Sequence, residues 1–204
     1  MPKPFPNHEQ QILSLARRQS LLRARDLAAH GLSTMTLTRL VSAGKLQRVA
    51  RGVYSLPLRS ISAHRSLAEV AIRVPRGVVC LLSALRLHEI GTQAPFEVWL
   101  AIPQTMPSPR MEQPALRVVR MSGGALSEGV EQVEVDGVSV SVFSPAKTVA
   151  DCFKYRNKIG LDVGLEALSE GWRARRVTMD ELWHYATVDR VHNVMRPYLE
   201  ALGA

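Results

Sequence analysis

Hydroxyl-bearing and basic side chains occur together in residues 33–39, where the sequence reads STMTLTR. Just beyond, Leu37, Leu40 and Val41 have the spacing of one apolar helix stripe, which predicts a helix over 34–43 with Ser33 as its N-cap. The other side chains should face solvent, where hydroxyls and guanidinium groups can bond to base edges in the major groove of DNA. An arginine paired with a guanine gives roughly 1–3 kcal/mol of discrimination. We therefore expect base contacts from Thr34, Thr36 and Arg39.

A second set of basic residues lies on either side of this helix. Lys45, Arg48 and Arg51 belong to a predicted hairpin, and Arg51 stands at its turn beside Gly52. A cation at such a turn can follow a phosphate or enter the minor groove. Few acidic residues lie nearby in the sequence, which argues against salt bridges in the hairpin. Contacts with flanking phosphates are expected from Arg17, Arg18, Arg23 and Arg25.

The net charge of +8 is confined to the first part of the chain. Residues 1–60 contain ten basic and two acidic side chains, whereas residues 61–204 contain sixteen of each. A polyanion is the natural partner of such a segment, because each neutralised phosphate releases condensed counterions. The alternative for any single residue is an ordinary cap or a solvated cation, and for the whole segment a basic face that only aids solubility.

The elements that would position these side chains follow a recognisable order. Helices are expected at about 7–19, 24–30 and 34–43, and the second and third end at Gly31 and Gly44. Two short strands, 45–50 and 53–56, then flank a tight turn. Three helices followed by a hairpin in fewer than sixty residues is the order of a winged helix-turn-helix. We expect this DNA-binding domain to span residues 1–58.

Residues 62–204 are expected to form a separate mixed α+β domain. Asp136-Gly137 between two alternating segments indicates a hairpin, so an antiparallel-type sheet is expected. Ser144-Pro145 begins a helix as N-cap and N1, and Thr178 with Glu181 forms a capping-box pattern. Strands are predicted near 78–80, 96–102, 116–121, 130–135 and 138–143, and helices at about 62–73, 83–90, from 144, 161–170, 179–186 and 189–202.

No motif of a common enzyme class occurs in the sequence. A phosphate-binding Gly-rich loop, a Gly-x-Ser-x-Gly elbow, a His-Glu-x-x-His pair and a nuclease-type Glu-x-Lys are all missing. We therefore expect no catalysis, no cofactor and no metal site. Lys147 could bind phosphate at a helix start, but a solvated first-turn lysine is more common. Cys80 and Cys152 are expected to be buried free thiols of a reducing cytosol. A cytoplasmic protein is expected, because the sequence has neither an apolar run long enough for a membrane span nor a signal peptide.

Several segments together resemble one protein family. The stretch from Leu37 to Tyr54, LTRLVSAGKLQRVARGVY, resembles the N-terminal winged helix of AbiEi-type antitoxins of type IV toxin–antitoxin systems. Three further segments are similar to the C-terminal domain of that family, namely 96–103 (FEVWLAIP), 144–153 (SPAKTVADCF) and 164–168 (GLEAL). The resemblance covers nearly the whole chain, and its motifs are moderately specific, because similar winged helices also precede unrelated nuclease domains.

The resemblance implies a function for each half of the chain. The N-terminal domain would bind repeats of double-stranded operator DNA in its own promoter, as a monomer that binds cooperatively. The C-terminal domain would oppose a nucleotidyltransferase toxin without forming a stable complex. Carried over by position, the residues that face DNA would be Thr34, Thr36, Arg39, Arg48 and Arg51. Candidates for binding an RNA or nucleotide on which the toxin acts are Arg173, Arg175 and Arg176. The alternative is that these are only solvated side chains at a helix end.

Two alternatives stay open at this point. A plain winged-helix repressor would carry a ligand-sensing or dimerising second domain, and a deep apolar pocket in residues 62–204 would favour it. A nuclease targeted by its DNA-binding domain would instead need clustered carboxylates on adjoining strands.

Overall fold

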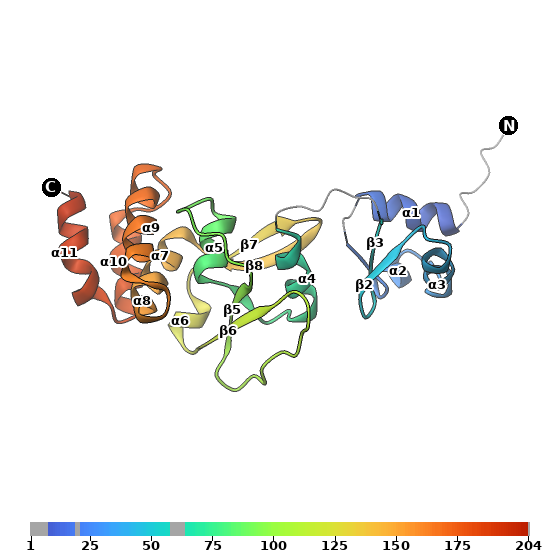
Figure 1. Ribbon diagram of the computed structural model, residues 1–204, viewed down its shortest axis with the longest axis horizontal. Helices are drawn as coiled ribbons and strands as arrows, with labels where there is room; N and C mark the ends of the chain where they lie inside the picture. Colours follow the sequence, from blue (N-terminus) through green and yellow to red (C-terminus); the bar gives the residue numbers. More distant parts are fainter. Residues whose placement is uncertain (1–7, 19–20, 58–63, 204) are drawn as a thin grey trace. The chain divides into compact units, whose positions relative to one another are not determined.

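The computed structural model describes residues 8–18, 21–57 and 64–203 of the chain. The chain divides into two compact units (Figure 1). The N-terminal unit comprises the residues up to Arg73 together with 134–139, and the C-terminal unit comprises 74–133 and 140–204. Among the described residues, no helix combines the length and apolar character that crossing a membrane requires.

The N-terminal unit has the order of elements of a winged helix-turn-helix. Its three-stranded sheet has the order β1-β3-β2, and both pairs are antiparallel. The three helices and the hairpin are confirmed, whereas the two-residue strand β1 was not predicted, since so short a segment has no readable periodicity. The elements are α1 (His8–Arg18), β1 (Leu22–Arg23), α2 (Asp26–Ala29), α3 (Met35–Ser42), β2 (Gln47–Ala50), β3 (Val53–Ser55) and α4 (Arg65–Arg73).

A small apolar core fixes the orientation of α3. Leu37 and Leu40 of α3 pack in one cluster with Ile12 of α1, Leu27 of α2 and Leu46 before β2. Each of these side chains is almost completely buried. Burial of a leucine contributes roughly 1.5–3 kcal/mol, so rotating α3 about its axis would be costly. The predicted N-cap of α1, Asn7, lies outside the described residues.

The C-terminal unit combines one sheet with a group of helices. Its five strands have the order β6-β5-β4-β8-β7. The elements are β4 (Val78–Val79), α5 (Leu81–Leu87), β5 (Val98–Pro103), β6 (Leu116–Met121), α6 (Gly124–Ser127), β7 (Val130–Val135), β8 (Val138–Phe143), α7 (Pro145–Lys154), α8 (Arg156–Ile159), α9 (Leu161–Arg173), α10 (Met179–Val188) and α11 (His192–Gly203).

The sheet is mixed, and the expectation of an antiparallel-type sheet was wrong in this respect. β4 pairs antiparallel with β5, but β5 pairs parallel with β6 and β4 pairs parallel with β8. The long Pro-rich connection between β5 and β6 lets the chain return to the start of β5 before pairing, as a parallel crossover requires. A hairpin signal such as Asp136-Gly137 specifies only its own two strands.

Helix α7 forms the centre of the helical part of this unit. It packs against α5, α9 and α10, and α8 to α11 continue from it toward the C-terminus (Figure 1). Ser144 caps α7 by accepting a hydrogen bond from the Lys147 amide, with Pro145 in the first turn, as predicted. The capping box of Thr178 and Glu181 at the start of α10 is confirmed.

Candidate nucleic-acid interface

The outward face of α3 carries a mixed set of polar, apolar and basic side chains. Met35 has 80% of its surface exposed although it is large and apolar. Thr34, Thr38 and Arg39 are exposed around it. The core contacts of Leu37 and Leu40 force this arrangement, because the side chains opposite them on a helix must point to solvent.

Thr36 does not belong to this face, and its expected exposure was wrong. Only 7% of its surface is accessible. Viewed down the axis of a helix with 3.6 residues per turn, Thr36 and Val41 flank the stripe formed by Leu37 and Leu40. Each lies about 70° around the axis from the middle of that stripe. Because Val41 is apolar, it was the side chain expected in the core, but the structure buries Thr36 and leaves Val41 half-buried. Thr38 is the threonine that faces solvent.

Ser33 satisfies part of the free backbone at the start of α3. Its hydroxyl accepts a hydrogen bond from the Met35 amide at 3.3 Å. Thr34 directly precedes α3, but its backbone is itself helical, with φ −67° and ψ −21°, and its side chain makes no capping bond. Ser33 therefore makes the side-chain bond that was expected of it at the start of this helix.

Glu9 of α1 brings two of the candidate cations together. Its carboxylate oxygens lie 3.5 Å from Arg39 Nη2 and 3.5 Å from Lys45 Nζ. The small number of acids near Lys45 in the sequence argued against a salt bridge there, and this expectation was wrong. The packing of α1 beside α3 places Glu9 next to Lys45. The two basic side chains remain 73% and 52% exposed. Exposed ion pairs contribute about 0–1 kcal/mol, so a phosphate can compete with Glu9 for either cation.

A second group of cations surrounds the turn between β2 and β3. The Ala24 amide donates a hydrogen bond to the Gly52 carbonyl at 2.8 Å, which holds the turn against the segment between β1 and α2. Gly52 has φ +73°, a conformation that favours glycine. A hollow of about 390 Å³ lies here, lined in part by Arg23, Arg25 and Arg51. Asp26 lies 4.0 Å from Arg23 and 3.7 Å from Arg25.

The remaining candidates, Arg48, Arg17 and its neighbour Arg18, are exposed on two elements, β2 and the last turn of α1. Arg48 lies on β2 directly before a bulge that shifts the register between Arg48 and Ala50. Arg17 lies in the last turn of α1, where a cation also interacts favourably with the helix dipole. The described residues up to Pro57 thus present several cations around α3 and the hairpin, with two acids, Glu9 and Asp26, to balance them.

In the C-terminal unit, Lys147 is completely buried, and the expectation of a solvated lysine was wrong. Lys147 Nζ lies 2.7 Å from Asp151 Oδ1 and 3.1 Å from Asp189 Oδ2, and Asp189 Oδ1 accepts from Lys154 Nζ at 3.0 Å. Lys147 Nζ also lies 4.5 Å from the centre of the Phe143 ring. The spacing of Lys147 and Asp151, one helical turn apart, indicates in the sequence that they can pair. Asp189 lies after the end of α10, and nothing in the sequence indicates that it pairs with Lys147.

Burial and charge act in opposite directions on this network. Burial would lower the pKa of Lys147, but the charges of Asp151 and Asp189 outweigh it and raise that pKa above its ordinary value. Burial raises the pKa of Asp151, whose Oδ2 has no hydrogen-bond partner among the residues that the structure describes. All three side chains are inaccessible to solvent, so the network joins α7 to the end of α10 and offers no surface to a substrate.

The two cysteines are buried free thiols, as expected. Burial raises the pKa of both thiols above the ordinary value, so neither is primed as a nucleophile. Within the described ranges, no group of three His, Cys, Asp or Glu side chains is arranged to hold a metal ion.

Comparison with known proteins agrees with this architecture. Residues 10–57 match the model of a family described as a transcriptional regulator, AbiEi antitoxin. The fold is similar to the crystal structure of the RV2827C protein from Mycobacterium tuberculosis, with a TM-score of 0.58, 14% sequence identity, and coverage of 91% of this chain and 73% of that chain. At this identity the likeness concerns the fold alone. No curated protein matches the chain.

The matched segment contains α2, α3 and the hairpin, together with most of α1, so it covers the surface described above. The match supports DNA binding and a role in transcription regulation or as an antitoxin. Residues 10–57 of this chain are thus similar to the transcriptional regulators of the AbiEi antitoxin family.

Proposed function

We propose that the N-terminal domain, residues 1–58, binds double-stranded operator DNA with α3 in the major groove. The observation that carries this proposal is the exposed face of α3, where Met35 leaves 80% of its surface in solvent beside Arg39. A large apolar side chain in that position is costly in water but can contact the methyl group of a thymine. The hairpin turn with Arg51 lies against the backbone or in the minor groove.

The candidate residues divide into two roles. Base edges are contacted from the outward face of α3 by Thr34, Met35, Thr38 and Arg39, and buried Thr36 is left out. Phosphates are contacted by the cations around this face, which fix the register of the protein on the duplex without reading sequence. These are Arg17, Arg23, Arg25, Lys45, Arg48 and Arg51.

Gel shifts over a salt series, with the promoter of the protein's own operon and an unrelated duplex, test this assignment. Arg39→Ala should weaken operator binding by about 5- to 150-fold and non-specific binding much less, if Arg39 reads a base. Arg51→Ala should weaken both and lower the slope of log K against log salt by about 0.9. Arg86→Ala, which removes an exposed arginine of α5, is the matched control and should change neither. Equal losses on both duplexes for Arg39→Ala would remove its base-reading role.

The operator-binding domain is proposed to repress its own operon in the cytoplasm, where the DNA is. We further propose that the second domain, residues 62–204, opposes a nucleotidyltransferase toxin without forming a stable complex and without catalysis of its own. Support comes from the AbiEi match of residues 10–57 and from the resemblance of segments 96–103 and 144–153 to the second domain of those antitoxins. Cooperative binding of monomers to promoter repeats belongs to the same proposal.

Co-expression separates the two activities. The full chain carrying both Arg39→Ala and Arg51→Ala should lose repression of a promoter reporter yet still rescue growth of cells that express a nucleotidyltransferase from the adjacent reading frame. Failure of the unaltered chain to rescue growth would favour a plain repressor with a ligand-sensing or dimerising second domain.

A further inference from the structure

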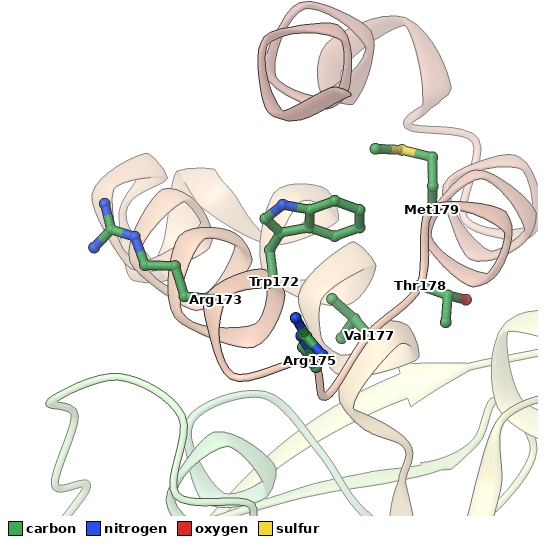
Figure 2. Close-up of a pocket in the computed structure, with 6 residues that line it drawn as sticks. All are labelled: Trp172, Arg173, Arg175, Val177, Thr178 and Met179. Atoms are coloured by element: carbon green, nitrogen blue, oxygen red, sulfur yellow. The ribbon is translucent and has the colours of Figure 1, made fainter. Parts of the chain in front are cut away.

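A hollow of about 620 Å³ lies at the C-terminal end of α9, within the C-terminal unit (Figure 2). The half-buried indole of Trp172 extends into it toward Val177 and Met179, the first residue of α10. Arg175 lies beside Val177 below the indole, whereas Arg173 points away on the other side. The lining residues are Trp172, Arg173, Arg175, Val177, Thr178 and Met179.

The chemistry of this hollow combines an aromatic face with uncompensated positive charge. Neither Arg173 nor Arg175 has a side-chain hydrogen bond or ion pair with any residue in the described part of the chain. Both are exposed, as is the adjacent Arg176. A flat indole accepts the face of a nucleobase whatever its identity, and guanidinium groups bind phosphate through paired hydrogen bonds.

The backbone holds Arg175 in a conformation that glycine adopts at lower cost. Arg175 has φ +53° directly after the end of α9. Its amide donates to the Trp172 carbonyl at 3.0 Å, and the Arg176 amide donates to the Gly171 carbonyl at 2.9 Å. These bonds close the helix end, a position where glycine is the usual residue. The chain places a cationic side chain there, next to the indole.

We propose that this hollow binds a nucleoside phosphate, with the base stacked on Trp172 against Val177 and Met179 and the phosphate on Arg175. Arg173, on the far side of the indole, suits the next phosphate of a strand. A free nucleotide and a nucleotide of a single-stranded RNA share this chemistry, and the experiment below separates them. The proposal concerns the C-terminal unit and does not depend on operator binding by the N-terminal unit.

Binding to the full chain tests the proposal. The probes are ATP, GTP, CTP and UTP by calorimetry, a labelled single-stranded RNA by fluorescence anisotropy, and inorganic triphosphate as the ligand without a base. The RNA measurements are made in an Arg39→Ala, Arg51→Ala background, so that cations of the winged helix contribute little. Trp172→Ala should weaken binding by about 5- to 150-fold, the range for one lost base stack, and Trp172→Phe should keep most of the affinity.

Arg175→Gln should weaken binding of the same ligands by about tenfold. Its matched control is Arg190→Gln, because Arg190 is also exposed, also has a positive φ of 58° and follows the end of α10. Arg190→Gln should leave affinity unchanged. Circular-dichroism melting of each variant separates loss of a contact from loss of the fold, and Trp172→Phe keeps the test decisive if Trp172→Ala unfolds.

Each outcome decides the matter. Binding of free nucleotides that depends on Trp172 and Arg175 supports the proposal and identifies the free ligand as the source, whereas such dependence for RNA alone identifies a strand. No measurable binding of any nucleoside phosphate overturns it. Equal binding of inorganic triphosphate and ATP, unaffected by Trp172→Ala, also overturns it, because that result describes a phosphate site without a base.

Discussion

Replacing Lys147 by methionine is expected to destabilise the C-terminal unit by about 3–5 kcal/mol. Methionine fills most of the volume of the lysine stem but removes the ammonium. That ammonium lies 2.7 Å from Asp151 Oδ1 and 3.1 Å from Asp189 Oδ2, and none of the three side chains is accessible to solvent. The substitution therefore tests whether a buried, charged group holds α7 to the end of α10.

The size of the destabilisation depends on which ion pairs Asp151 and Asp189 still make in the variant. Asp189 keeps its ion pair with Lys154 Nζ at 3.0 Å, but Asp151 loses the only ion pair that it makes among the described residues. An isolated buried carboxylate takes up a proton instead of staying charged, and burial already raises the pKa of Asp151. Because Asp151 can take up a proton in this way, the expected loss of unfolding free energy lies near 3 kcal/mol, the lower end of the range. This corresponds to about 10 °C in melting temperature for a unit of this size.

The pH dependence has a definite sign. In the variant, the folded-state pKa of Asp151 should lie above its unfolded value, so this group favours the folded state most at low pH and loses that contribution as the pH rises above about 4. The difference in unfolding free energy between the unaltered protein and Lys147→Met should therefore be larger at pH 8 than at pH 5. Urea unfolding followed by circular dichroism at both pH values measures it.

Two further variants make the result interpretable. Lys158→Met removes an exposed lysine of α8 and should cost less than about 0.5 kcal/mol. Lys147→Met combined with Asp151→Leu removes two of the three buried charges and leaves Asp189 paired with Lys154. This double variant should recover most of the stability, because an apolar pair can replace a buried ion pair at little cost. A midpoint for Lys147→Met equal to that of Lys158→Met, or a double variant less stable than the single one, would refute this reasoning.

Three other predictions follow from burial and exposure. Met35→Ala should weaken operator binding several-fold in the same gel shifts. Exchanging the contacted thymine for uracil should weaken operator binding by the unaltered protein but not by this variant. Thr36→Val should change operator binding less than twofold, because Thr36 is buried. Cys80 and Cys152 should resist a thiol reagent in the native protein and both react in denaturant; native labelling at the rate of free glutathione would contradict their burial. Burial raises the pKa of Tyr155 to about 12, above its unfolded value near 10, so stability should be full below pH 10 and fall toward pH 12, and a Tyr155→Phe variant should show a smaller fall in urea unfolding.

Local signals in the sequence determined the order of elements in the winged helix. Gly31 and Gly44 follow α2 and α3 with φ of +65° and +66°, a conformation that favours glycine, so a glycine after an apolar stripe predicts a helix end. The same holds for Ser144 before α7 and Thr178 before α10, whose side chains bond to backbone three residues away. The resemblance to AbiEi-type antitoxins rested on segments 37–54, 96–103, 144–153 and 164–168, and the family match to residues 10–57 agrees with it for the first of these.

The tertiary structure decided what depends on distant partners. Helical periodicity leaves Thr36 and Val41 equivalent about the Leu37–Leu40 stripe, and only packing chose which of them is buried. Lys147 meets Asp189 across 42 residues of sequence, and no local pattern predicts which distant acid a helix will meet. A capping bond or a glycine turn is complete within a few residues and is therefore written in the sequence, whereas burial, ion pairing and strand direction are properties of two segments that only folding brings together.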